Sequence, residues 1–128
     1  MKVIIGVVPG ESSDDALALG GLLCQDLGAR AVLTHIHPAA YDYASPGHVD
    51  AEWEKYLIDE SRSFLAASVE RGTEFGITDP GQVIFGHRSS GVGLAEVAQA
   101  EGAEMIVIGS APGASNGRFQ IGSTADQL

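Results

Sequence analysis

Cationic side chains are scarce in this sequence. The 128 residues include 7 Lys and Arg against 17 Asp and Glu, so the formal net charge is −10. Nucleic acids and anionic membranes both bind basic surfaces, so this charge argues against either as a partner. Near the start, residues 1–15 hold one Lys and only a short hydrophobic stretch before acidic residues follow. The sequence therefore predicts neither a signal peptide nor a membrane span.

Cysteine is almost absent, and aromatic residues make up 6% of the chain. The single cysteine, Cys24, cannot form an internal disulfide, which favours a reducing cytoplasmic location. It lies on the apolar face of a predicted helix, so we interpret it as a small core residue and not as a nucleophile. The sequence also lacks repeats, low-complexity tracts and long linkers. We predict one domain over residues 1–128, with enough apolar residues for a single core.

Short β-branched runs alternate with helical patterns along the chain. The predicted strands cover residues 2–8, 30–37, 81–86 and 103–109. The first predicted helix begins at Ser12 or Ser13, either of which could cap it, and ends at Gly28. The second runs from about Val49 to Arg71, and the third covers residues 91–102. This alternation is typical of an α/β fold with a doubly wound, open parallel sheet. Right-handed crossovers give the strand order 3-2-1-4.

The first two predicted helices each carry an apolar stripe at helical spacing. The stripes consist of Leu17, Gly20, Cys24 and Leu27 in the first helix and of Trp53, Leu57, Phe64 and Ala67 in the second. Asp14 and Asp15 are adjacent, so they do not face each other as a catalytic carboxylate pair would. Acidic residues are favoured in the first turn of a helix, and we expect both aspartates to cap the start of this helix.

Three histidines lie at or near the ends of predicted strands. His35 and His37 are two residues apart on one strand, so their side chains share a face and could chelate zinc. A zinc site needs further ligands, so a structural role is favoured and no metal site is predicted. His87 follows the third strand, where it could border a ligand cleft or serve no function.

A loop of small residues follows the last predicted strand. It contains Gly109, Gly113, Gly117 and Gly122, and Ser123 stands where a further helix could begin. A glycine-rich turn lets backbone N–H groups approach an anion closely, and a helix N-terminus adds further donors. The Ser123 hydroxyl could donate to a phosphate or help to hold Mg²⁺. The pattern indicates a phosphate cradle, with a plain connection as the alternative. It is neither a Walker A loop nor a dinucleotide fingerprint, because the lysine and the G-x-G-x-x-G spacing are missing.

Several segments together resemble the universal stress protein family over essentially the whole chain. They are "KVIIGVV", "SSDDAL", "LTHIHP", "VIFGH" and "AEGAEMIVIGS". The final loop resembles the Gly-x2-Gly-x9-Gly-Ser/Thr loop of the ATP-binding branch, with Gly109, Gly122 and Ser123 at its first, third and fourth positions. The resemblance implies a fold like that of the adenine nucleotide alpha hydrolases. It also implies an adenine nucleotide ligand, with Mg²⁺ as a companion ion.

Two positions depart from the family pattern. Pro112 stands where the second glycine is expected, with Gly113 one place later, and proline has no N–H to donate. Val8, after the first strand, stands where the nucleotide-binding relatives carry an aspartate that helps to hold the adenosine. Ile36 matches the position whose backbone meets the adenine. The implied nucleotide-binding residues are Val8, Ile36, Gly109, Pro112, Gly113, Gly122, Ser123 and Thr124.

The resemblance implies a nucleotide-sensing or nucleotide-storing module of the stress response, in which the loop over 109–123 holds ATP, ADP or AMP. One alternative is an interaction module of the same fold that has lost nucleotide binding and works through dimerisation. The other is a slow ATP hydrolase, but the sequence offers no general base or arginine finger, and we name no catalytic residue. Relatives close with a fifth strand that commonly pairs across a homodimer. We expect that strand to be absent here, and the homodimer to be weakened or rerouted.

Overall fold

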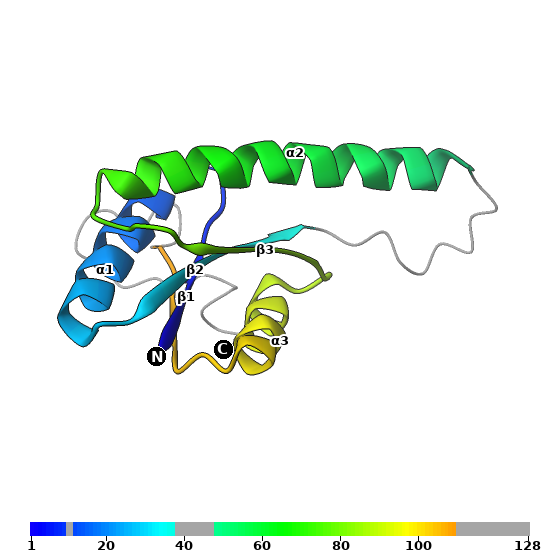
Figure 1. Cartoon of the computed structure of the whole chain (residues 1–128). Coiled ribbons are helices and arrows are strands. Elements are labelled where there is room, and N and C mark those ends of the chain that lie inside the picture. The colour runs from blue at the N-terminus through cyan, green and yellow to red at the C-terminus, as the bar shows by residue number, and fades with distance from the viewer. Residues whose placement is uncertain (10–11, 38–47, 110–128) are drawn as a thin grey trace, which may run out of the picture.

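The computed structural model describes residues 1–9, 12–37 and 48–109 of the chain. Within them, strands and helices alternate as predicted from the sequence (Figure 1). The elements are β1 (Lys2–Gly6), α1 (Ser12–Leu27), β2 (Arg30–His37), α2 (His48–Thr73), β3 (Gly81–Gly86), α3 (Ser90–Glu101) and β4 (Met105–Val107). The predicted elements are confirmed, although β1 and β4 are shorter than predicted.

The described strands form one parallel sheet in the order β3-β2-β1-β4. β1 lies inside the sheet, with Lys2 opposite Arg30 of β2 and Val3 opposite Met105 of β4. The predicted order 3-2-1-4 is therefore confirmed. The chain steps outward from β1 to β2 and β3 and then returns to the other side of β1 for β4. The topological switch point, where doubly wound sheets bind their ligands, thus lies between β1 and β4.

Helices cover both faces of the sheet (Figure 1). α1 and α2 pack on one face, where Leu17 and Leu65 join the core, and α3 packs on the other face through Leu94. Val3 and Ile4 of β1 point to opposite faces, and neither has exposed surface. The continuous apolar run of the first strand follows from this double burial.

The buried faces of the helices differ from the predicted stripes. Leu27, at the end of α1, is 46% exposed, and Ala67 on α2 is exposed. The sheet side of α2 instead includes Ser61 and Ser68, each 5% exposed. The Ser68 hydroxyl donates to the Phe64 carbonyl at 3.1 Å, so the helix itself satisfies this buried group. The stripe prediction was wrong at Leu27 and at Ala67. On α2 the reason is that a small serine such as Ser68 can be buried once its hydroxyl bonds to the preceding turn.

Both ends of α3 are capped. Ser89 precedes the helix in extended conformation, and its hydroxyl oxygen accepts a hydrogen bond from the Val92 N–H at 3.3 Å. Gly102 ends the helix with a φ of 67°, in the left-handed region that glycine tolerates best. The predicted end at Gly102 is confirmed, whereas the Ser89 cap was not predicted.

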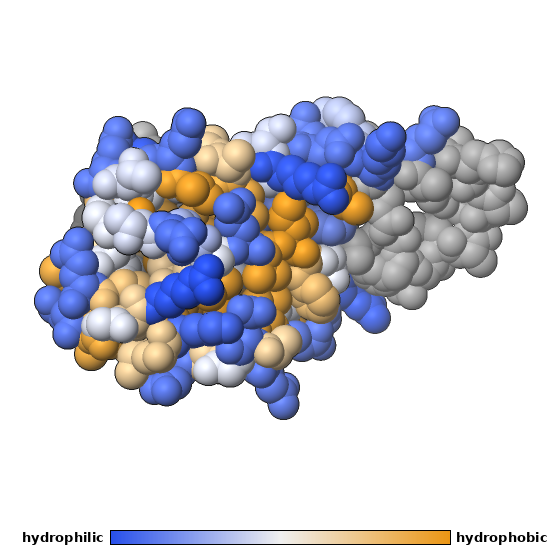
Figure 2. All heavy atoms as spheres, viewed as in Figure 1, coloured by the Kyte–Doolittle hydropathy of each residue, from blue (hydrophilic) through white to orange (hydrophobic). Residues whose placement is uncertain are grey.

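Apolar residues are visible at the surface between α2 and α3, where the edge strand β3 runs (Figure 2). Every position of β3 except Gln82 is half-buried. None of the helices within 12–37 and 48–109 combines the length and the apolar composition that crossing a bilayer would require.

Candidate functional site

Three of the predicted site residues lie together at the carboxyl edge of the sheet. Val8 follows β1, Ile36 is near the end of β2, and Gly109 follows β4, and these strands are neighbours in the sheet. The other five, in the loop after Gly109, fall outside the described residues, and they are Pro112, Gly113, Gly122, Ser123 and Thr124. The described part of the candidate site is therefore the rim that β1, β2 and β4 form around the switch point.

A serine occupies both backbone groups of Val8. The Val8 N–H donates to Ser13 Oγ at 2.8 Å, and the Ser13 hydroxyl donates to the Val8 carbonyl. Ser13 is 6% exposed, whereas Val8 is 47% exposed. Ser13 lies inside α1, and its hydroxyl closes the turn between β1 and α1. Of the two serines that could cap the helix, Ser13 therefore does not. The Val8 side chain itself offers a ligand only an isopropyl group, which has no hydrogen-bonding atom.

The backbone groups of Val7 are occupied as well. Its N–H donates to the Thr34 carbonyl at 2.9 Å, which extends the pairing with β2 beyond the strand end. Its carbonyl accepts a hydrogen bond from His35 Nδ1 at 3.0 Å. Because a carbonyl can only accept, Nδ1 carries the proton in the neutral ring. The His35 ring also packs edge-on against Phe64, with ring centroids 5.0 Å apart.

The main chain of Ile36 has no ladder partner among the described residues. Residues along a strand direct their N–H and C=O groups alternately to either neighbour, so Ile36 faces β1 as Thr34 does. The next acceptor on that side is the Val7 carbonyl, which accepts a hydrogen bond from His35 and none from the Ile36 N–H. No residue within the described ranges pairs with the Ile36 N–H or C=O. One donor and one acceptor on the β1 side of Ile36 are therefore unpaired within residues 1–9, 12–37 and 48–109.

The side chain of Ile36 is fixed by close packing under α3. It joins the apolar cluster on that face, and a Cβ built on Gly93 would lie 3.0 Å from Ile36 Cγ2. Glycine at position 93 thus lets the first turn of α3 approach the end of β2. The main chain of Ile36 is consequently held in a fixed orientation.

His87 joins β3 to α3. Its N–H donates to the His37 carbonyl at 3.0 Å, and its Nδ1 accepts a hydrogen bond from the Ser89 N–H at 2.9 Å. Its Nε2 lies 3.7 Å from Glu96 Oε1, a contact that becomes an ion pair when the ring is protonated. These contacts give His87 a structural role, which was neither of the two alternatives left open by the sequence. Within 1–9, 12–37 and 48–109, no three His, Cys, Asp or Glu residues are grouped so as to hold a metal ion.

Asp14 connects α1 to α2. Its carboxylate accepts two hydrogen bonds from Arg71, to Oδ1 and Oδ2, each at 3.0 Å. Arg71 also pairs with Glu74 and lies over the Phe75 ring, 5.3 Å from its centroid. The hydrogen bonds from Arg71 lower the pKa of Asp14. Asp14 is in the first turn of its helix, as predicted, and the partner 57 residues away was not foreseen.

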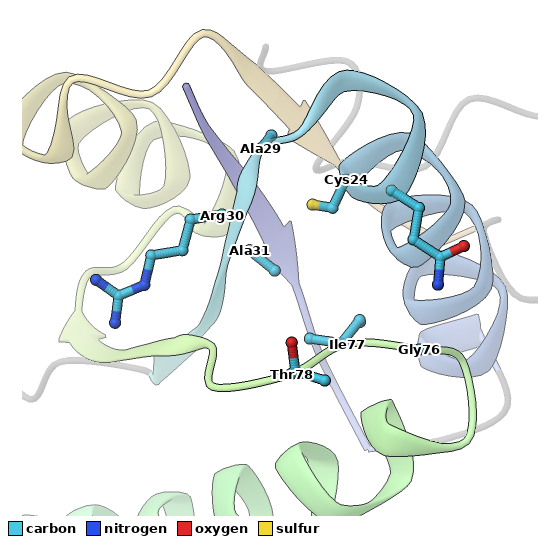
Figure 3. Close-up of a pocket in the computed structure, with 8 residues that line it drawn as sticks. Cys24, Ala29, Arg30, Ala31, Gly76, Ile77 and Thr78 are labelled. Carbon is cyan, nitrogen blue, oxygen red and sulfur yellow. The ribbon is translucent and has the colours of Figure 1, made fainter.

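A separate hollow of about 230 Å³ lies at the opposite, amino edge of the sheet (Figure 3). Cys24 of α1 borders it on one side, the start of β2 at Ala31 forms its floor, and Ile77 and Thr78 border it on another side. Burial raises the pKa of the Cys24 thiol, so the less reactive protonated form is favoured. Cys24 is half-buried and packs against the core cluster, as predicted, and it also borders this hollow. The hollow shares no residue with the rim around the switch point, where the fold places ligands.

His35 makes the stability of the fold depend on pH. Burial lowers the pKa of His35 from its usual 6.5, the bond to Val7 opposes this shift, and the charge of His37 adds to it. The unfolded chain therefore takes up a proton that the folded chain excludes, so the free energy of unfolding is expected to fall as pH decreases below about 6.5. In His35→Asn, whose amide N–H can replace Nδ1–H, this pH dependence should shrink, whereas His87→Asn should retain it. Urea unfolding between pH 7.5 and 5 measures both, and an unchanged slope in His35→Asn would contradict the assignment.

Comparison with known proteins assigns the chain to a family. A family model described as the universal stress protein family matches residues 1–128. The chain belongs to the universal stress protein family. The resemblance seen in the sequence segments is thereby confirmed, and the fold inferred from them agrees with the observed sheet.

Relatives of this universal stress protein differ from it in length and sequence. A universal stress protein of Mycobacterium tuberculosis is 29% identical over 133 residues, which cover 100% of this chain and 44% of the relative. The chain thus spans less than half of that protein. Universal stress protein UspA from Lactobacillus plantarum superimposes with a TM-score of 0.76 at 14% identity, over 98% of this chain and 88% of UspA. At that identity the match shows the shared fold.

Two further solved structures contain nucleotides. A universal stress protein in complex with cAMP matches with a TM-score of 0.62 and 20% identity, over 90% of this chain and 79% of its own. The universal stress protein from Archaeoglobus fulgidus in complex with dAMP matches with a TM-score of 0.57 and 13% identity, over 83% and 78% respectively. Members of this fold therefore bind adenine nucleotides.

Proposed function

We propose that this universal stress protein domain binds ATP, ADP or AMP at the carboxyl edge of its sheet and serves as a nucleotide-sensing or nucleotide-storing module of the cytoplasmic stress response. The observation that carries the proposal is the main chain of Ile36, whose N–H and C=O are unpaired among the described residues beside the switch point. Ligands of doubly wound sheets bind at that point. The relatives solved with cAMP and dAMP support an adenine nucleotide.

The rim offers complementary groups for an adenine ring. Adenine presents a ring nitrogen acceptor beside an amino donor, and one N–H and one C=O from Ile36 can satisfy both. The half-exposed Val8 isopropyl group supplies an apolar surface against which a base can lie. A hydrogen bond between an Ile36 group and a ligand would contribute about 0.5–1.5 kcal/mol, the usual net value for such a bond.

The loop after β4 would hold the phosphates. Gly109, Gly113 and Gly122 would bring backbone N–H groups to the phosphate oxygens, and Ser123 and Thr124 would add hydroxyl groups that could also support Mg²⁺. Pro112 brings no N–H to this cradle, so it would weaken the phosphate end.

Affinity is the measurement that tests the proposal. Val8 replaces a carboxylate whose charge-assisted hydrogen bond is worth roughly 1.5–3 kcal/mol, so binding should be at least about tenfold weaker than in a complete site. We expect calorimetric titration of ATP into the protein to give a dissociation constant on the order of tens of micromolar or poorer. Adenosine and tripolyphosphate, titrated separately, should each bind more weakly than ATP, because each fills one end only. If millimolar ATP gives no heat, the domain does not bind the nucleotide, and the interaction module becomes the better interpretation.

A further inference from the structure

The outer edge of β3 has no pairing partner among the described residues. β3 is an end strand of the sheet, and β2 is its neighbour on the inner side. Just after β3, the His87 N–H donates to the His37 carbonyl of β2, and successive residues of a strand face its two sides alternately. Every second residue of β3 therefore directs its N–H and C=O outward. These residues are Gln82, Ile84 and Gly86.

β3 also lacks the side chains with which proteins usually protect an exposed strand edge. Residues Gly81–Gly86 include no charged residue and no proline. Val83 and Phe85 pack on the α3 side of the sheet, Ile84 packs on the side of α1 and α2, and all three are only half-buried. Apolar surface is visible in this region between α2 and α3 (Figure 2). Both the main chain and the side chains of β3 can therefore accept a further strand.

We propose that the outer edge of β3 pairs antiparallel with β3 of a second copy of this chain, so that the two sheets become continuous. A two-fold axis perpendicular to the sheet makes such a pairing antiparallel, and residues with outward groups then lie opposite each other. A register with Ile84 opposite Ile84 of the second copy uses every outward residue, because Gln82 then lies opposite Gly86. This proposal does not depend on nucleotide binding.

The same register suits the side chains and the charges around the strand. Val83 lies opposite Phe85 of the second copy, and pairs of a β-branched with an aromatic residue stabilise neighbouring strands. Exposed Asp79 precedes β3, and exposed Arg88 follows it. Antiparallel pairing brings the Asp79 end of each copy to the Arg88 end of the other, whereas a parallel neighbour would bring like charges together. The edge is thus complementary to itself, which favours a second copy as its occupant.

Hydrogen exchange in the wild-type protein tests the proposal residue by residue. We expect the outward amides of Gln82, Ile84 and Gly86 to exchange at least about tenfold more slowly at millimolar than at low micromolar concentration. The amides of Val83 and Phe85 face β2 and should change less. Sedimentation velocity over the same range should show an equilibrium between monomer and dimer. A protein that stays monomeric at millimolar concentration overturns the proposal. Protection of the outward amides at every concentration also overturns it, because the chain itself would then cover the edge.

Two pairs of variants test the interface and its register. Gln82→Pro removes an outward N–H from each copy, and proline is tolerated at an edge position whose N–H faces solvent. The dimer dissociation constant should rise about tenfold or more, whereas Gln82→Ala keeps the N–H and should dimerise like the wild type. Asp79→Asn should weaken the dimer about threefold, whereas Asp26→Asn removes the same charge from an exposed position of α1 and should not weaken it.

The variants contradict the proposal in two ways. A dimer that Gln82→Pro leaves intact places the interface elsewhere and overturns it. Equal dissociation constants in Asp79→Asn and Asp26→Asn overturn the antiparallel register. Circular dichroism verifies that each variant is folded, and the exchange measurement decides the question in the wild type if one of them is not.

Discussion

ATP binding is expected to disappear in Gly122→Val, while Gly117→Val retains it within about threefold. Gly122 stands at the third position of the family loop, where a backbone N–H must come close to a phosphate oxygen, and a branched side chain would fill that space. Gly117 lies in the same loop but outside the pattern, so it is the matched control for a change in loop flexibility. Titration with ATP up to millimolar concentration measures both variants.

Two outcomes would contradict this expectation. Wild-type affinity in Gly122→Val would show that the loop connects two elements and does not cradle phosphate. Equal loss in both variants would show that valine disrupts the loop in general, so that the pattern positions have no special role. A loss confined to Gly122→Val, from tens of micromolar to beyond a millimolar, corresponds to roughly 2 kcal/mol or more of binding free energy.

The architecture of the sheet could be predicted because its signals are local and repeated. Val3, Ile4 and Ile5 form an unbroken apolar run, and all three are fully buried in the central strand β1. Alternation of such runs with helical patterns predicts the parallel sheet, and the handedness of crossovers predicts its order. Ala67 was placed on the wrong side of α2 because periodicity counts serine as polar, although Ser68 is buried with its hydroxyl bonded to the preceding turn.

The position of the site could be predicted, but its hydrogen bonding could not. Val8, Ile36 and Gly109 are recognisable because each lies at or just beyond the end of a predicted strand. The main chain of Ile36, unpaired among the described residues, could not be predicted, because it depends on where the pairing of β1 with β2 ends. Ser13 likewise fits the composition of a helix start, and sequence patterns do not distinguish a capping hydroxyl from one that closes the preceding turn.

Loss of the Ser13 hydroxyl is expected to lower the free energy of unfolding by about 2 kcal/mol. In Ser13→Ala the N–H and the carbonyl of Val8 both lose their partner, and each unpaired buried group costs about 1–3 kcal/mol. Val8 is half-exposed, so water can reach part of this turn and pair with the freed groups. The combined cost of the two groups should therefore lie near the low end of the range, at about 2 kcal/mol. Urea denaturation monitored by circular dichroism gives the difference.

Ser68→Ala is the matched control, since Ser68 and Ser13 are similarly buried. The Ser68 hydroxyl bonds only to the Phe64 carbonyl, which the helix already pairs with a backbone N–H. Its removal leaves no group unpaired, and alanine favours the helix, so the change should stay within about 0.5 kcal/mol. Equal effects in the two variants would mean that Ser13 contributes through packing alone. The turn after β1 would then be held by Thr34 and His35 through Val7, and the Val8 groups would be open to a ligand.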